Sequence, residues 1–146
     1  MPFPPHILAR LRRARVGRLA TADVRGRPHV VPVCFAADAT AVYHAIDRKP
    51  KGLPPERLAR VRNIAANPRV ALLVDHYDDE KWGRLWFVLV RGRARLLRRG
   101  AARNRGIALL RRKYRQYRHG MLGADPLVIA IRPDAVSAWG LKGAAR

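Results

Sequence analysis

The segment at residues 41–74 constrains the fold of this chain more than any other, because it places a cationic loop between ordered elements. An apolar run leads into the loop, and a helical pattern that opens at the proline pair 54–55 follows it. The helix is expected to stop at Asn67-Pro68, and a second apolar run comes next. The segment therefore predicts the order strand, basic loop, helix, strand.

Arg48, Lys49 and Lys51 place three cations within four residues of this loop. Guanidinium and ammonium groups make charge-assisted hydrogen bonds to phosphate oxygens, so the loop is a candidate phosphate-binding site. The alternative is a solvated surface turn, which is the common setting of a run of like charges.

Short β-rich runs and helical patterns occupy the rest of the chain. Helices are expected at residues 4–15 and 101–118, where apolar residues recur at helical spacing. Strands are expected at residues 16–22, 28–36, 41–46, 69–75, 84–97 and 126–138. Tight turns between short strands favour an antiparallel barrel over a parallel doubly wound sheet. The sequence therefore predicts a mainly β (α+β) fold, with short helices plugging a small barrel.

Three details of the expected strands bear on where a ligand can approach. Pro32 has no backbone N–H to donate, which predicts an unpaired edge or a bulge at that point, open to a ligand. Gly92 predicts a bulge or bend in the longest strand. Residues 69–75 form a continuous apolar run, which predicts a strand buried on both faces.

The net charge of +21 and the pI near 11.8 are the outlying features of the composition. Such a field attracts anions, including nucleic acids and acidic membrane surfaces. Nearly all the cations are arginine, however, beside abundant Ala, Gly, Pro and Val, which is what GC-rich coding alone produces. The charge is therefore better evidence for an anionic ligand than for nucleic-acid binding.

A length of 146 residues predicts one domain over residues 1–146. Cys34 is the single cysteine, which excludes an intramolecular disulfide framework and a multi-cysteine zinc site and favours a cytoplasmic location. No apolar run approaches the roughly 20 residues that span a bilayer, and the first residues lack the apolar stretch of a secretory signal.

The residues that usually carry enzyme chemistry are sparse. The five histidines are scattered, GxSxG, GxGxxG and P-loop motifs are missing, and Cys34 lies inside an apolar run. No metal site is expected, and no individual catalytic residue can be assigned. A bound organic cofactor therefore becomes the expected source of reactivity, with the protein supplying position and electrostatics.

Four motifs follow one another along the chain: VGRLATADVRGRPHVVPVCFA at 16–36, AVYHAIDRKPKG at 41–52, NIAANPRVALLVD at 63–75 and WFVLVRGRARLL at 86–97. In this order they resemble the pyridoxamine 5'-phosphate oxidase-like split β-barrels, which bind flavins and deazaflavins. The resemblance covers roughly residues 7–140. It implies a split β-barrel like that of FMN-binding proteins, and a homodimer that holds two cofactors at the subunit interface.

The resemblance also implies roles for individual residues. Arg48, Lys49 and Lys51 would bind the cofactor phosphate, and the strand around Pro32 and Val33 would offer backbone groups to the ring system.

Four aromatic or imidazole side chains are implicated in the same way. Tyr43 and His44 precede the cationic loop and would lie close to the cofactor ring or its side chain. Trp86 and Trp139 would cover the cofactor or form the substrate pocket, from the second subunit in one arrangement. The alternative for aromatic residues on strands is a place in the core.

Coenzyme F420 is the favoured cofactor. It is a deazaflavin with a phosphodiester and a polyglutamate tail, and the excess of arginine suits the carboxylates of that tail. FMN is the alternative. The implied activity is a reductase that passes hydride from F420H2 to a small organic acceptor of unknown identity.

Two other activities of similar proteins are not expected. The chain ends at Arg146 without the C-terminal arginine motif of vitamin B6 oxidases, and no histidine follows His119 to serve as the ligand of haem-degrading relatives. A function of another class is a non-enzymatic basic protein whose arginine-rich helix at 103–118 contacts nucleic acid or membrane.

Overall fold

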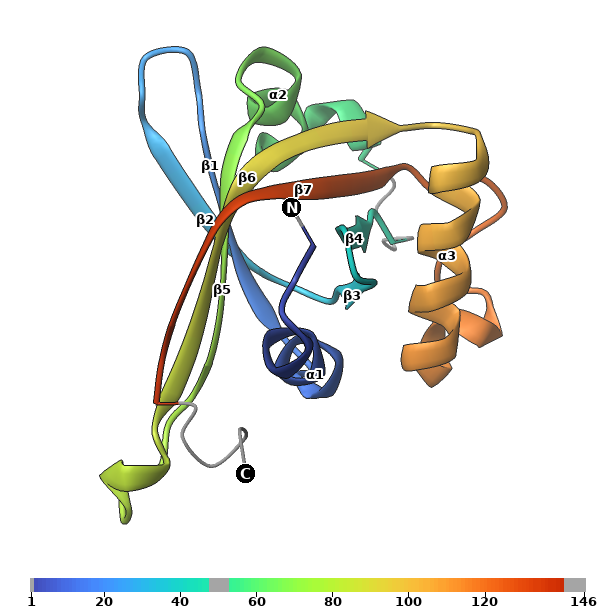
Figure 1. Cartoon of the computed structure of the whole chain (residues 1–146). Helices are drawn as coiled ribbons and strands as arrows, with labels where there is room; N and C mark the ends of the chain where they lie inside the picture. The colour runs from blue at the N-terminus through green and yellow to red at the C-terminus, as the bar shows by residue number, and fades with distance from the viewer. Residues whose placement is uncertain (1, 48–52, 141–146) are drawn as a thin grey trace.

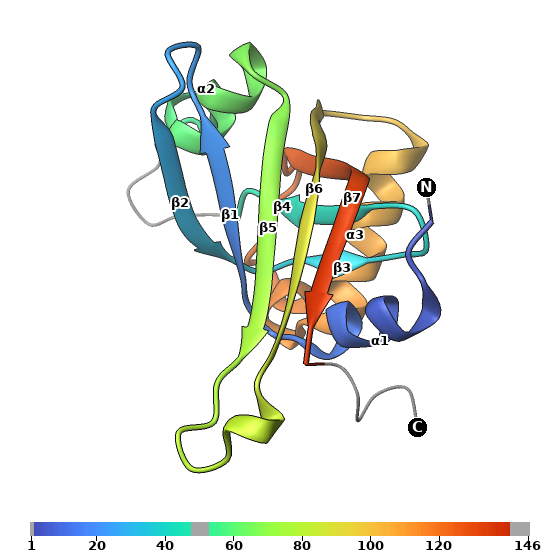
Figure 2. The same cartoon turned by 60° about the vertical axis from the view of Figure 1, so that its left-hand side comes forward.

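The computed structural model describes residues 2–47 and 53–140, which form an antiparallel sheet with helices packed around it (Figures 1 and 2). The sheet has seven strands in the order β2-β1-β5-β6-β7-β4-β3. The strands are β1 (Gly17–Ala22), β2 (Pro28–Val33), β3 (Ala36–Ala37), β4 (Val42–Ala45), β5 (Arg69–His76), β6 (Trp86–Leu97) and β7 (Val128–Trp139). All pairings are antiparallel, which confirms the predicted mainly β arrangement.

Three α-helices and three short 3-10 helices complete the described chain. The α-helices are α1 (Pro5–Arg13), α2 (Ala59–Ala66) and α3 (Ala101–Lys113). The 3-10 helices are η1 (Pro55–Arg57), η2 (Trp82–Arg84) and η3 (Arg115–His119). Across the described residues, every helix is too short or too polar to cross a membrane.

The β6–β7 ladder is the longest pairing, and it contains a bulge. Arg91 faces Ala135 while Gly92 faces Pro133, so Asp134 on β7 has no opposite residue. The ladder is therefore irregular at Gly92, as the sequence predicts. A bulge increases local bending and twist, and Figure 1 shows both strands turning sharply around α1.

Two hydrophobic clusters hold the helices on the sheet. The first packs α1 and α2 against the strands and includes Leu11, Leu19 and Phe35, each fully buried. The second packs α3 against β4 and β7 through Leu110 and Val128. Burial of one such aliphatic side chain contributes roughly 1.5–3 kcal/mol, so these clusters fix the helix positions.

Both long helical predictions are wrong in one respect, because each helix is interrupted. Leu58 has φ −67° and ψ 137°, so η1 and α2 are separate elements. The Leu58 carbonyl accepts hydrogen bonds from the amides of Val61 and Arg62 and so begins α2. Tyr114, with φ −116° and ψ 119°, separates α3 from η3, because its hydroxyl is bonded to the Phe35 backbone.

The prediction that residues 69–75 are buried on both faces is also wrong for the single chain. Val70, Leu72 and Val74 are buried, whereas Leu73 between them is 36% exposed. The hydrophobic clusters cover one face of β5, and the apolar residues on its other face remain accessible.

Replacing Gly92 with alanine is expected to reduce the free energy of unfolding by about 1–3 kcal/mol. A Cβ at this position would collide with the backbone carbonyl of Arg132 and lie 3.0 Å from the Pro133 Cα atom. Urea unfolding measures the effect. Gly83→Ala is the matched control, because a Cβ there meets nothing within 4 Å, and it should change stability by less than about 0.5 kcal/mol. Equal stability of the two variants would contradict the close backbone approach at the bulge.

Candidate functional site

His44 on β4 and Arg60 on α2 form a hydrogen-bonded pair in the protein interior. The Nε of Arg60 donates to Nε2 of His44 at 3.1 Å, and Nδ1 of His44 lies 2.8 Å from the Cys34 carbonyl oxygen. A guanidinium only donates and a carbonyl only accepts, so Nδ1 carries the imidazole proton. The geometry therefore holds His44 neutral and in one tautomer.

Arg60 is a buried cation, with an exposed fraction of 9%. Burial lowers the pKa of Arg60, and the charge of Asp47 partly opposes that shift. No described carboxylate lies within 4.0 Å of its guanidinium. A buried charge without an ion pair is unfavourable, and an anion beside it would compensate for the burial.

The described residues do not form a metal site. Three or more His, Cys, Asp or Glu side chains do not gather anywhere within those residues. The His44–Arg60 pair, with its positive charge, is suited to an anion.

Packing on β1 holds Arg60 in place. The side-chain amide of Asn63 donates to the buried Thr21 hydroxyl at 3.0 Å, and Val61 and Ile64 are buried on the same helix. Arg60 precedes Ile64 by four residues and therefore shares the apolar face of α2. The sequence did not lead us to Arg60. The signal that could have identified it is its spacing of four residues from Ile64, which places a cation on the apolar face of the helix.

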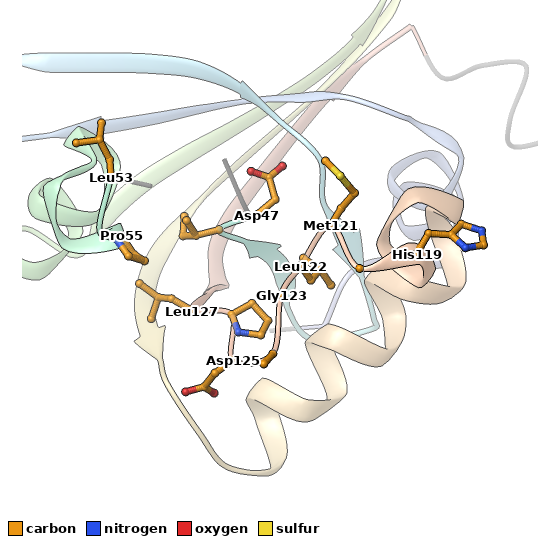
Figure 3. A pocket seen from close by; sticks show the side chains of 13 residues that line it. Asp47, Leu53, Pro55, His119, Met121, Leu122, Gly123, Asp125 and Leu127 are labelled. Atoms are coloured by element: carbon orange, nitrogen blue, oxygen red, sulfur yellow. The ribbon is translucent and has the colours of Figure 1, made fainter. Parts of the chain in front are cut away.

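A groove of about 920 Å³ opens where the predicted phosphate loop would begin and end (Figure 3). Ile46 and Asp47 line it from the end of β4, and Leu53 lines it from the approach to η1. Residues 119–127 form its other wall, and Figure 3 shows Leu53 on the opposite side from Met121. Arg48, Lys49 and Lys51 themselves lie outside the described residues, so their role stays a prediction.

The end of β2 lies beside the His44–Arg60 pair. The order of the sheet places β2 at an edge. Among the described residues Pro32 is exposed and faces only Arg18 on β1, which confirms the predicted unpaired edge. Val33 is buried in the first cluster. Because His44 contacts the Cys34 carbonyl, the fold brings the strand end at Val33 and the imidazole together.

Tyr43 points into the second cluster, on the opposite face of β4 from His44. Its hydroxyl donates to Asp38 at 3.1 Å, and Asp38 is itself buried. Asp38 also accepts hydrogen bonds from the backbone and hydroxyl of Thr40, from the amide of Ala41 and from Nε of Arg105 at 2.6 Å. Tyr43 and Asp38 thus lock the β3–β4 turn onto α3 and support the strand that carries His44.

Trp86 and Trp139 line a second groove, of about 600 Å³, at the far end of the β6–β7 ladder. Trp139 is 55% exposed and stacks on Phe87, with ring centres 6.5 Å apart. The guanidinium of Arg10 contacts Trp86, with the guanidinium carbon 5.0 Å from the centre of the indole ring. The lining is mostly apolar and includes Leu73.

The two tryptophans are far from His44 within one chain. His44 pairs with Ile129, which pairs with Leu96, and Trp86 lies ten residues away from Leu96 on β6. At about 3.3 Å per residue this separation is roughly 30 Å along the strand. Figures 1 and 2 both show β5 and β6 extending toward η2, beyond the other strands. The fold therefore places Val33 and His44 in one group and Trp86 and Trp139 in another, while Tyr43 points away from both.

Residues 3–140 match the sequence profile of the pyridoxamine 5'-phosphate oxidase family. The chain belongs to this family. A 5a,11a-dehydrotetracycline/5a,11a-dehydrooxytetracycline reductase from Streptomyces rimosus is 31% identical over 143 residues, which are 98% of this chain and 87% of the relative.

Two solved structures support the assignment at the level of the fold. A conserved hypothetical protein from Mycobacterium tuberculosis has a TM-score of 0.75 at 17% identity, covering 100% of this chain and 89% of that chain. A FAD-binding protein from Mesorhizobium loti has a TM-score of 0.63 at 26% identity, covering 94% and 95%. The predicted split β-barrel of the pyridoxamine 5'-phosphate oxidase family is thereby confirmed.

Asp38→Asn is expected to lower the free energy of unfolding by about 2 kcal/mol at pH 7, because hydrogen bonds to a buried carboxylate become weaker. Burial raises the pKa of Asp38, but the hydrogen bonds from Arg105, Thr40, Tyr43 and Ala41 together bring it below its usual value. The contribution is therefore complete above about pH 4 and is lost as the pH falls through the folded-state pKa.

Urea unfolding of wild type and variant between pH 7 and pH 2.5 tests this prediction, and the difference should narrow at acid pH. Asp134→Asn is the control, since Asp134 is exposed and lies 3.9 Å from an exposed Arg93; its effect should stay below about 0.5 kcal/mol. A difference for Asp38→Asn that is constant over the whole range would contradict the assigned role.

Proposed function

We propose that this protein is a reductase that binds coenzyme F420 and passes hydride from F420H2 to a small organic acceptor. The observation that carries the proposal is Arg60, a buried guanidinium that lacks a described carboxylate partner and lies on the helix that follows the cationic loop in sequence. The names of two similar proteins support the class: one is a reductase, and another binds FAD.

In this proposal Arg60 and the loop cations Arg48, Lys49 and Lys51 bind the cofactor phosphate. The Nε of Arg60 is used by His44, and its two terminal nitrogens make no hydrogen bond to any described residue. They are therefore available to two phosphate oxygens, the geometry in which arginine binds phosphate well.

The neutral His44 and the strand end at Val33 would orient the ring system. His44 cannot rotate without losing its bonds to Cys34 and Arg60, so it presents a fixed surface. When bound, the deazaflavin supplies the hydride chemistry, and the protein supplies position and exclusion of water. The choice of F420 over FMN rests on charge: a chain with net charge +21 is suited to a cofactor with several carboxylates.

The tryptophan groove is proposed as the acceptor site, completed across a homodimer. Leu73, Phe87 and Trp139 are each at least 36% exposed and adjoin one another. Contiguous exposed apolar side chains are typical of an interface or a ligand site. Because Trp86 lies ten residues along β6 from Leu96, the residue level with His44, a second subunit would bring its Trp86 and Trp139 to the cofactor. An apolar, unsaturated acceptor suits this lining.

Arg60→Gln is expected to weaken F420 binding by about 10- to 100-fold, the effect of losing one charge-assisted contact to phosphate. Quenching of tryptophan fluorescence on titrating the cofactor-free protein measures the affinity. Arg62→Gln is the matched control, because Arg62 lies two residues later on α2 and is exposed. The double variant Lys49→Ala, Lys51→Ala should also bind F420 much more weakly.

Parallel titrations with FMN decide between the two cofactors. Preferential binding of F420 by wild type is the expected result, and preferential binding of FMN would contradict the choice of cofactor. Equal affinities of Arg60→Gln and Arg62→Gln for F420 would contradict the phosphate role of Arg60. Binding of neither cofactor would favour the non-enzymatic basic protein instead.

A further inference from the structure

A pocket of about 540 Å³ lies where the C-terminal ends of α1 and α3 meet β3. Four cations line it: Arg12 in the last turn of α1, Arg15 just after that helix, and Arg112 and Lys113 at the end of α3. The described residues that line the pocket include no carboxylate, and the pocket shares no lining residue with the groove beside Asp47.

Two of the four cations are held in place by the opposite helix. The Nζ of Lys113 donates to the Leu11 carbonyl at 3.2 Å and lies 4.0 Å from the ring centre of Phe35. The Nη2 of Arg15 donates to the Lys113 carbonyl at 3.0 Å, and its guanidinium carbon lies 4.7 Å from the ring centre of Tyr114. Each helix end is therefore capped by a cation from the other, and the pocket wall is ordered.

Helix ends alone do not balance this charge. Each helix C-terminus is equivalent to about half a negative charge, so the two ends offset about one of the four cations. Arg12 and Arg112 make no ion pair with any described residue. An excess of about three positive charges therefore remains around one concave site.

Lys113 is the titratable group of this pocket. Burial lowers the pKa of Lys113 to about 8, and the charge of Arg15 adds to the shift. An anion in the pocket would raise the pKa of Lys113 again, because it would favour the ammonium form.

We propose that this pocket binds a small multivalent oxyanion through Arg12, Arg112 and Lys113. Phosphate esters and closely spaced carboxylates share this chemistry, so one probe of each kind is needed. The floor from Ala36, Ala37 and Leu109 is apolar, which suits a ligand with a short carbon or bridging core between its charged groups. The proposal does not rest on the cofactor assignment.

Isothermal titration of the cofactor-free full chain with pyrophosphate, and separately with citrate, at constant ionic strength tests the proposal. Wild type should show one saturable site for at least one probe. The double variant Arg12→Gln, Arg112→Gln should bind that probe at least about tenfold more weakly. The probe that binds more tightly identifies whether phosphate or carboxylate groups are preferred.

The matched control is Arg13→Gln, Arg111→Gln. It removes the same charge from the same two helix ends, but neither residue lines the pocket. Its affinity should stay within about threefold of wild type. Equal weakening of both double variants, or no saturable binding to wild type, would overturn the proposal in favour of a solvated basic surface.

Proton uptake gives a second readout that surface charge would not produce. The groups facing Lys113 are Arg12, Arg15, Arg112, Tyr114 and Cys34. Because a bound anion raises the pKa of Lys113 above about 8, binding should take up protons near pH 8.5 and weaken as the pH rises further. Titrations in buffers of different ionisation enthalpy measure the uptake, and Lys113→Gln should abolish it. Uptake unchanged in Lys113→Gln would contradict the assignment.

The same variants keep this proposal separate from the proposed function. Loss of anion binding in Arg12→Gln, Arg112→Gln with F420 affinity retained would establish a site distinct from the cofactor phosphate. Loss of both anion binding and F420 binding in this variant would contradict two distinct sites. If wild type does not bind F420 at all, the anion titration still tests this pocket, because it uses the cofactor-free protein.

Discussion

The bulged β6–β7 ladder is the constraint on which the rest of the structure depends. The first residues of β7 also pair with β4, which carries His44, and the last residues of β7 place Trp139 opposite Phe87. At the bulge the unpaired Asp134 allows the ladder to curl around α1. One pair of strands thus closes the barrel at one end and presents an aromatic groove at the other. The proposed cofactor site, which uses both ends, would require two chains.

The placement of positive charge is the second constraint on the structure, and each buried cation is held by hydrogen bonds to neutral groups. Arg60 is bonded to a neutral imidazole, and Lys113 is bonded to a helix carbonyl and placed over an aromatic ring. Neither arrangement supplies a full negative charge. Anions that bind the folded chain but not the unfolded chain would therefore stabilise it, by an amount that grows with their concentration. Anion binding and the stability of the fold are therefore coupled through these basic residues.

Local chemistry made much of this fold predictable from sequence. The stop at Asn67-Pro68 and the irregularity at Gly92 each follow from the conformational limits of one or two residues. Arg60 was missed because its burial depends on His44 and Cys34, which are distant in sequence. Tyr114 interrupts a helical pattern for the same reason, through a bond to Phe35. Long-range partners, not propensity, decided these positions.

A crystal structure of the protein with F420 bound tests the central claim most directly. We expect oxygens of the cofactor phosphodiester within hydrogen-bond distance of the terminal nitrogens of Arg60, and the ring system beside the strand end at Val33. Trp86 and Trp139 near that ring should belong to the second subunit. A cofactor phosphate bound elsewhere, with no contact to Arg60, would contradict the assignment of this site.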